Sequence, residues 1–559
     1  MKLPSTGPKA LIAIFVAFLV PAYWIAFHAP AVGIYHDDGI YLVTAKALAE
    51  GKGYRIISLP GELTQTKYPI LFPGILSVAW KIFPRFPDNA KFMKTLPLLF
   101  AILWLWLSYK LIREETGVPD VALWIVLLTA ASSWVVFFST TIMSETLFAC
   151  LCAGALIWLK RLEAPGKDEG VGWTLLISSA LVAASFLTRT AGAPLIAAGA
   201  ISLFFKRKYI AGVMFLFICA ILIAPWFWWQ SIYADSGHAM DPYYSASNYN
   251  NWNILMNFTS EQKLQVLLMN LIFLVFSPIA LLNMKGYAVV IIISLVFTMV
   301  TCLGFIRDLR QDIKLFHLFL FFYCGTIIMW AWPPHRFLLP TIPFLLLYAY
   351  KGFSRICGRI SKSGTIQAYA SLIIVVLLSI QMIYGLLLST GETLKRQTVS
   401  FVPSIYQQDN WKDTRALLDW VRQNTPQDSI LLGNLDPTYY LYTGRKAVRG
   451  FTADPFFLFY SEKPDTALGQ VSDLVQRIVA NRIRYVIRTP SLFFKDAVIF
   501  NGILDRLILD YPGALHLVKV GTDPSYRVYE VDQERLLYAP QSRGGMQRDG
   551  HGPGVESPK

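Results

Sequence analysis

The sequence predicts an α-helical polytopic membrane protein of about 11 to 13 transmembrane helices, followed by a small C-terminal α/β domain. Of its 559 residues, 55% are apolar. The apolar runs are about 18–22 residues long, enough to cross a bilayer as helices, and they lack the alternation of barrel strands. From about Gly391 the composition changes to that of a soluble domain. We therefore expect a membrane domain over residues 1–390 and an α/β domain over 391–540.

The net charge of +14 would suggest nucleic-acid binding in a soluble protein. Here Lys and Arg lie in short clusters between the apolar runs, as the positive-inside rule predicts for a membrane protein, so no nucleic-acid partner is expected. Lys2 and Lys9 place the N-terminus in the cytoplasm, and the basic residues of 351–362 place the C-terminal domain outside.

The first span is expected at residues 10–27, as an uncleaved anchor, because the run is long enough to cross and many others follow. Residues 28–94 then form an unusually long outer loop. Within this loop, residues 70–83 are too short and too rich in proline to cross, so we expect a helix lying on the membrane surface.

The later spans follow from apolar runs bounded by charged or aromatic residues. Residues 267–282 are ambiguous, because counting them as a span would send Arg307, Arg310 and Lys314 outside. We interpret them as re-entrant or interfacial. The remaining spans are expected at residues 95–112, 121–138, 141–160, 173–187, 194–205, a run ending in the aromatic belt 225–229, 287–306, 315–330, 337–350 and 366–388.

The C-terminal region alternates between helical and strand patterns, which is typical of a small α/β domain. Its sequence has no glycine-rich phosphate loop and no metal-ligand cluster. The tail, 541–559, is rich in glycine and proline and is expected to be disordered. Helices are expected at 411–424 and 471–481, and strands at 429–433, 484–488, 515–520 and 526–531.

Two adjacent carboxylates, Asp37 and Asp38, begin an amphipathic pattern in the first outer loop. Tyr41, Ala45 and Leu48 share one face, which predicts a helix at the bilayer surface. Capping this helix is a common role for Asp and explains one carboxylate. The other is left over, and a helix N-terminus favours its ionised form. It would be a proton acceptor or a metal ligand.

Further ionisable residues, Glu145, Arg189, His335 and Arg336, lie at the outer ends of spans, and Lys67 lies in the first loop. Taken singly, each of these residues has a structural explanation: the acid lies in the first turn of a helix, the arginines can reach lipid headgroups, and the histidine lies in a turn. Together they lie on the side where the positive-inside rule predicts few cations. This clustering predicts a site that binds an anion and abstracts a proton.

At these residues the sequence resembles the GT-C superfamily of membrane glycosyltransferases, in particular the protein O-mannosyltransferase-like branch that includes lipid A aminoarabinose transferase. There are two departures: Asp38 stands where many members have Glu, and Tyr68 separates Lys67 from Pro69, so that branch's substrate is not carried over. The resemblance rests on Asp37-Asp38-Gly39-Ile40-Tyr41, Lys67-Tyr68-Pro69, Ser144-Glu145, Leu187-Thr188-Arg189-Thr190-Ala191-Gly192 and Arg336-Phe337-Leu338-Leu339-Pro340.

The resemblance implies a GT-C-like multi-pass protein of the bacterial inner membrane that uses a polyprenyl-phosphate sugar donor. It would transfer the sugar, with inversion, to an envelope lipid, glycan or protein acceptor on the extracytoplasmic face, and residues 241–252 would face the acceptor. Asp37 would be the catalytic base, and Asp38 and Glu145 would orient the acceptor or hold a divalent cation. The remaining substrate-binding residues would be Tyr41, Lys67, Tyr68, Arg189, His335 and Arg336, with Lys67, Arg189 and Arg336 on the leaving phosphate.

Two other interpretations remain open from the sequence. A transporter or flippase for lipid-linked sugars would use the same charges to line a path, although transporters tend to have repeated halves and charges near the middle of the membrane. A sensor would use the helices only to anchor its C-terminal domain. The sequence does not identify the sugar or the acceptor.

Overall fold

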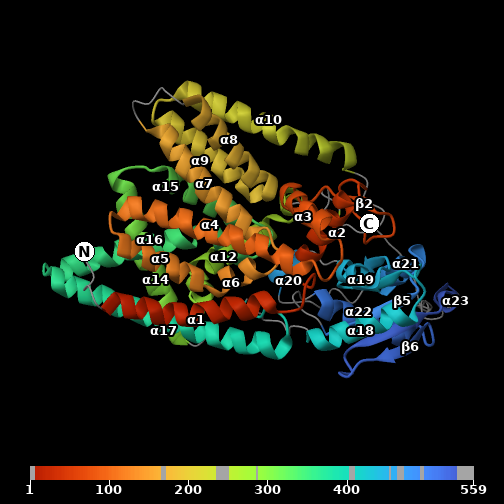
Figure 1. Cartoon of the computed structure of the whole chain (residues 1–559). Coiled ribbons are helices and arrows are strands. Elements are labelled where there is room, and N and C mark those ends of the chain that lie inside the picture. The colour runs from red at the N-terminus through yellow and green to blue at the C-terminus, as the bar shows by residue number, and fades with distance from the viewer. Residues whose placement is uncertain are drawn as a thin grey trace, which may run out of the picture.

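The computed structural model describes residues 7–164, 171–234, 244, 251–284, 288–401, 410–451, 455–461, 471–490 and 496–537. Figure 1 shows a body of long helices, with the C-terminal α/β domain lying at one end of it beside α2 and α3. We call this end of the body the α2 end and the opposite end the far end. The expected tail, 541–559, lies outside the described residues.

Six helical segments among the described residues are long and apolar enough to cross a membrane, so the chain is a multi-pass membrane protein. In Figure 1, α1 and α17 run side by side along one edge of the body. The six are α1 (Gly7–His28), α4 (Ala90–Thr116), α10 (Tyr209–Tyr233), α14 (Ala288–Gln311), α17 (Gly364–Arg396), and η3 (Pro334–Thr341) together with α16 (Ile342–Ile360).

The segment predicted as one span at 121–138 is broken, which corrects the prediction of a straight helix. Helices α5 (Pro119–Ala131) and α6 (Ser133–Thr140) meet at a bend of 66°. Asn283 accepts from the Ser133 N–H at 2.7 Å and donates to the Ala131 carbonyl at 2.9 Å. Its amide therefore satisfies one backbone N–H and one carbonyl at the break, which makes the break more tolerable inside an apolar body.

The other helices of the body are shorter or carry more charge. Residues 267–282, predicted not to cross, fall in two helices separated by a break at Phe276. The full set of these shorter or more charged helices is α7 (Glu145–Glu163), α8 (Val171–Thr188), η1 (Thr190–Gly192), α9 (Ala193–Phe205), α11 (Asn251–Asn257), α12 (Ser260–Val275), α13 (Ser277–Leu281) and α15 (Leu315–Ile328).

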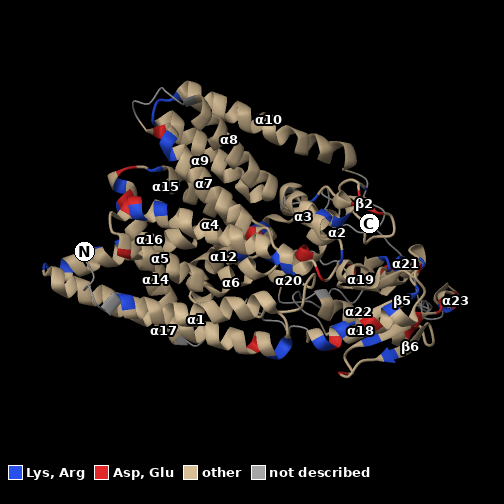
Figure 2. Ribbon diagram, in the orientation of Figure 1, with Lys and Arg blue, Asp and Glu red and all other residues tan. Residues whose placement is uncertain are grey.

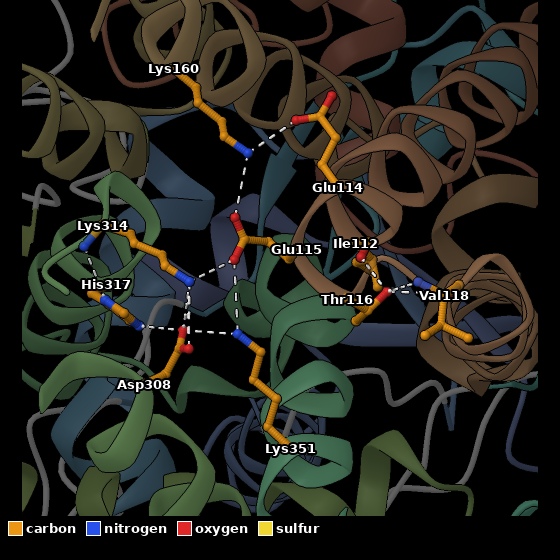
Figure 3. A network of polar contacts seen from close by, with 10 residues as sticks. All are labelled: Ile112, Glu114, Glu115, Thr116, Val118, Lys160, Asp308, Lys314, His317 and Lys351. Atoms are coloured by element: carbon orange, nitrogen blue, oxygen red, sulfur yellow. Dashed lines mark hydrogen bonds and ion pairs between the residues drawn. The ribbon is translucent and has the colours of Figure 1, made fainter. Parts of the chain in front are cut away.

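Most charged side chains of the body lie at its two ends, and its middle is nearly free of them (Figure 2). At the far end, Glu115 of α4 lies 3.4 Å from Lys160 of α7, 2.8 Å from Lys314, which precedes α15, and 3.8 Å from Lys351 of α16 (Figure 3). Lys351 is also 2.9 Å from Asp308 of α14. Five helices are thus joined where their polar ends leave the apolar layer.

At the α2 end the first outer loop folds into a layer of its own. It contains α2 (Asp37–Ala49), α3 (Leu71–Ile82) and an antiparallel pair of short strands, β1 (Arg55–Ile56) and β2 (Leu63–Thr64). Helix α3 buries Phe72 and Leu76 and exposes Val78 and Ile82. That it lies on a membrane surface stays a prediction.

The C-terminal domain is a five-stranded sheet of order β4-β3-β5-β7-β6, in which β4, β3 and β5 are parallel and β7 and β6 antiparallel to their neighbours. Helix α17 continues through Gly391 to Arg396, so the domain boundary expected from composition falls inside a helix. The strands are β3 (Leu431–Gly433), β4 (Ala447–Arg449), β5 (Tyr485–Arg488), β6 (Leu515–Val520) and β7 (Arg527–Val531); the helices are α18 (Trp411–Asn424), α19 (Asp436–Thr443), α20 (Pro455–Phe459), α21 (Val471–Ala480), α22 (Asp496–Asp510) and α23 (Gln533–Leu537).

Candidate active site

Asp37, the first residue of α2, is buried at the α2 end of the body. Its Oδ1 accepts a hydrogen bond of 2.7 Å from the Tyr68 hydroxyl, and its Oδ2 accepts one of 2.6 Å from Arg336 Nη2. Burial raises the pKa of Asp37, but the Arg336 guanidinium, the Tyr68 hydroxyl and His36 outweigh it, so the pKa lies well below its usual value. Asp37 is therefore a carboxylate at neutral pH.

Arg336, in η3, joins Asp37 to the acid that begins α7. Its Nε and Nη2 lie 3.0 Å and 2.7 Å from Glu145 Oε1. Arg189, between α8 and η1, places its Nη1 2.9 Å from the same oxygen and donates to Ser144 Oγ at 3.1 Å. Two carboxylates and two guanidinium groups thus alternate in one row, in the order Asp37, Arg336, Glu145, Arg189.

The Glu145 side chain uses only one of its oxygens in this row. Oε2 is buried and has no hydrogen-bond partner among the described residues. A buried, unpaired carboxylate oxygen is costly to maintain in a folded protein, and such atoms call for an explanation. It is an available acceptor for a substrate hydroxyl.

Aromatic rings line the row. The Phe337 ring lies under both guanidinium groups, with its centroid 5.2 Å from Arg189 Cζ and 5.8 Å from Arg336 Cζ. The Tyr41 hydroxyl is hydrogen-bonded to Ser144 Oγ at 3.0 Å, and its ring packs edge-on against Tyr68. Aromatic side chains thus contact both guanidinium groups and the Ser144 hydroxyl beside them.

Asp38 faces away from the row, into its own loop. Its Oδ2 accepts from the Gly33 N–H at 2.7 Å, and its Oδ1 accepts from the N–H groups of Tyr35 and Gly39 at 2.9 Å each. Burial raises the pKa of Asp38 to about 7, and these three donors oppose the rise. The carboxylate therefore holds the turn that precedes α2.

These residues do not fit a divalent cation. Both oxygens of Asp38 accept from backbone donors, and Asp37 and Glu145 are each paired with guanidinium groups. In the part of the chain that the structure describes, no group of three or more His, Cys, Asp or Glu is arranged to hold a metal ion. The expected site at Asp38 and Glu145 is not formed, because the two side chains point into different surroundings.

Two predicted site residues remain, Lys67 and His335, and they have different surroundings. Lys67 lies with its Nζ 5.2 Å from the centroid of the Tyr68 ring, so it reaches the row through that tyrosine. His335 instead packs between two other rings: it is stacked on Trp134, with centroids 6.5 Å apart, and meets Phe273 edge-on, with centroids 5.0 Å apart. The structure thus gathers the predicted residues other than Asp38 and His335 around the row.

Sequence reasoning assigned no role to Ser144 or Phe337, although both stand in the motifs that carried the resemblance. It also missed contacts from the C-terminal domain to the turn before Asp37, where Asp436 lies 3.6 Å from His36. No local pattern could have revealed a contact across 400 residues of sequence. The predicted acceptor loop, 241–252, lies mostly outside the described residues, but Tyr244 is described and is hydrogen-bonded to Asp436.

Of the comparisons with known proteins, only the one with solved structures found matches to this chain. No family model matches the chain, and no curated protein matches its sequence. ArnT from Cupriavidus metallidurans in the apo state is 12% identical with a TM-score of 0.55, over 94% of this chain and 99% of that one. The same protein bound to undecaprenyl phosphate is 13% identical with a TM-score of 0.57, over 93% and 98%.

A third solved structure, the archaeal oligosaccharyltransferase AglB from Archaeoglobus fulgidus, is 12% identical with a TM-score of 0.48, over 94% of this chain and 75% of that one. The match to ArnT extends over nearly the whole of both chains, so it includes the helical body, the first outer loop and the C-terminal domain. The predicted fold class, a GT-C-like polytopic helical protein with a small C-terminal α/β domain, is confirmed: this chain shares the fold of ArnT.

Proposed function

We propose that this protein is a membrane glycosyltransferase that moves a sugar from a polyprenyl-phosphate donor to an acceptor hydroxyl or amine on the extracytoplasmic face of the bacterial inner membrane. The observation that carries the proposal is the row of Asp37, Arg336, Glu145 and Arg189 at one end of a GT-C body, in which both carboxylates are buried and both arginines are partly exposed. It places a candidate proton acceptor beside two cations, which is what transfer from a phosphate leaving group requires.

The donor class is supported by the position of the cations and by the fold. Arg189 and Arg336 lie at the ends of membrane helices, where the phosphate of a lipid anchored in the bilayer can reach them. Guanidinium groups bind phosphate through two parallel N–H groups. ArnT, whose fold this chain shares, has been solved bound to undecaprenyl phosphate.

The reaction follows from these roles. As the acceptor oxygen or nitrogen attacks the anomeric carbon, Asp37 takes its proton, the new glycosidic bond forms and the bond from that carbon to the phosphate oxygen breaks. The phosphate leaves with the bonding electrons, and Arg189, Arg336 and Lys67 stabilise its charge. Attack from the side opposite the phosphate inverts the anomeric configuration. Glu145 Oε2, which is unpaired in the described part of the chain, accepts a hydrogen bond from the acceptor or the sugar.

Arg336 has two roles in this scheme. In the structure it donates to Asp37 and holds the pKa of that carboxyl low, which makes Asp37 a weak base. When a donor phosphate also binds Arg336, its positive charge is shared, so the pKa of Asp37 rises toward a value suited to proton abstraction. The base therefore becomes stronger when the donor is present.

A lipid-sugar flippase is the alternative function. It would move the same donor across the membrane without breaking the sugar–phosphate bond. Purified protein in liposomes, incubated with a bacterial lipid extract, separates the two by mass spectrometry. A transferase converts the lipid-linked sugar to free polyprenyl phosphate, whereas a flippase leaves the donor chemically intact; an intact donor with every acceptor fraction would rule out the transferase.

A further inference from the structure

The residue before Asp37 has a strained backbone. His36 has φ 66° and ψ −61°, and the Asp37 N–H donates to the Tyr35 carbonyl at 2.9 Å. This is a γ-turn of the positive-φ type, which is rare for residues other than glycine and costs free energy. Such strain persists only where surrounding contacts hold it, and it clusters at functional sites. The turn ends at Asp37, so its geometry sets the direction of that carboxylate.

A chain of hydrogen bonds from the C-terminal domain holds this turn from behind. Asp436, the fully buried first residue of α19, lies with its Oδ1 3.6 Å from His36 Nε2. The Tyr244 hydroxyl donates to Asp436 Oδ2 and lies 3.3 Å from the same His36 nitrogen. Because this hydroxyl has a single proton, giving it to Asp436 leaves its oxygen to accept from His36 Nε2–H.

The rest of α19 packs closely on the same loop. The Thr438 hydroxyl donates to the Gly33 carbonyl, and the Tyr442 hydroxyl donates to the Val32 carbonyl at 3.2 Å. A Cβ on Gly39 would lie 2.9 Å from Pro437 Cβ, too close for any other residue at this position without movement. The turn is thus clamped between Asp38 on its inner side and α19 on its outer side.

We propose that the C-terminal α/β domain positions the catalytic base: the chain His36–Tyr244–Asp436 holds the strained turn that aims Asp37 at the row. His36, Tyr244 and Asp436 act as positioning residues, through Asp37. The proposal rests on the proposed function for the role of Asp37, but the clamp itself does not depend on the reaction. The clamp also brings Tyr244, which belongs to the predicted acceptor loop 241–252, into contact with His36 of the turn.

The test compares variants of the chain with one that breaks a different contact between the same domain and loop. Tyr244→Phe keeps the ring and removes the hydroxyl, and Asp436→Ala removes the carboxylate. Lys446→Met is the matched control: Lys446 donates to Glu62 at 2.6 Å and to the Ile57 carbonyl at 2.5 Å, away from the turn. All three are made in the full-length protein.

We expect Tyr244→Phe and Asp436→Ala to lower kcat by about tenfold to a hundredfold, with the KM for the lipid donor unchanged, because a small displacement of a reacting group is enough for such a loss. Asp436→Asn, whose carbonyl still accepts from Tyr244, should restore most of the rate. Lys446→Met should keep the kcat of the wild type. A merely structural contact would instead change both kcat and KM in all variants in proportion to their melting temperatures.

A second readout does not use the reaction. Hydrogen–deuterium exchange of the peptide covering residues 32–40, without substrate, should be faster in Tyr244→Phe and Asp436→Ala than in the wild type and Lys446→Met. In a His36→Gly background, where glycine adopts a positive φ without strain, Asp436→Ala should add little to either readout.

Unchanged exchange at residues 32–40 in both variants would overturn the clamp, as would equal loss of kcat in Lys446→Met. If both variants exchange faster but the wild type transfers no sugar from any lipid donor, the clamp stands and the proposed function is refuted. If Asp436→Ala does not fold, Tyr244→Phe decides both readouts.

Discussion

Replacing Arg336 by Ala should reverse the way in which stability depends on pH. In the wild type, Asp37 and Glu145 are both buried and share this guanidinium. Removing one partner of a buried ion pair typically costs about 3–5 kcal/mol, because the remaining charge is buried without compensation. Arg189 still contacts Glu145 in the variant, so the larger share of this loss falls on Asp37.

The sign of the pH dependence follows from the pKa of Asp37. In the wild type this pKa is lowered on folding, so Asp37 contributes stability above its unfolded value of about 4, which is lost as the pH falls below it. In Arg336→Ala the burial remains without the cation, so the pKa is raised instead. Stability is then present at low pH and lost as the pH rises through the folded value. Between pH 4 and 8 the melting temperature of the variant should therefore fall with rising pH.

The assay is thermal unfolding in detergent from pH 4 to 8, together with sugar transfer at saturating donor. The rate should fall by about a hundredfold, the cost of about 3 kcal/mol expected for losing a preorganised charge at a transition state. Arg310→Ala, at the exposed far end of α14, is the control. Adding Asp37→Asn to Arg336→Ala should restore much of the lost stability but no activity. An Arg336→Ala variant with the melting curve and rate of the wild type at every pH would show that Arg336 neither stabilises the buried carboxylates nor takes part in transfer.

Other predictions follow from single contacts. Asp37→Asn should stay folded and lose about a hundredfold or more in transfer rate, because the amide cannot take a proton. Asp38→Asn should instead lower the free energy of unfolding by about 1–3 kcal/mol, and with it the melting temperature, because its amide NH₂ cannot accept from the backbone donors. Tyr68→Phe should raise the pKa of Asp37 and so move the acidic limb of kcat/KM to higher pH, which a pH–rate profile measures; an unmoved limb would exclude this hydrogen bond from the mechanism. Asn283→Leu should cost about 2 kcal/mol or more by leaving the Ser133 N–H unpaired at the break, and unfolding at the temperature of the wild type would contradict that role.

Local signals in the sequence were sufficient for most of the elements. The helix at Trp411–Asn424 and the strand at Leu515–Val520 match their predicted bounds, because amphipathic period and turn residues mark their ends. Strand β4, of three residues, was not predicted. The break at Ser132 could not be predicted, because Asn283, which pairs with the backbone there, lies 150 residues from Ser133 in the sequence.

The candidate site likewise combines features that the sequence could predict with features that it could not. The ionisable residues at helix ends could be predicted, since charges there are expensive without a purpose. Their pairing could not: an arginine that reaches headgroups and one that joins two carboxylates look identical in sequence, and Arg336 is of the second kind. The different surroundings of Asp37 and Asp38 could not be predicted either: Asp38 binds the backbone of its own loop at Gly33, whereas Asp37 binds Arg336, which lies 299 residues away in the sequence.

The proposed function requires Asp37 to act as the base in sugar transfer from a polyprenyl-phosphate donor. The most direct measurement counts molecules of free polyprenyl phosphate released per sugar transferred, in liposomes that contain either the wild type or Asp37→Asn together with a lipid extract. We expect one polyprenyl phosphate per sugar for the wild type, and a rate lower by about a hundredfold or more in a folded Asp37→Asn variant. Equal rates in the two proteins, or a donor that changes leaflet with its sugar–phosphate bond intact, would contradict the proposed function.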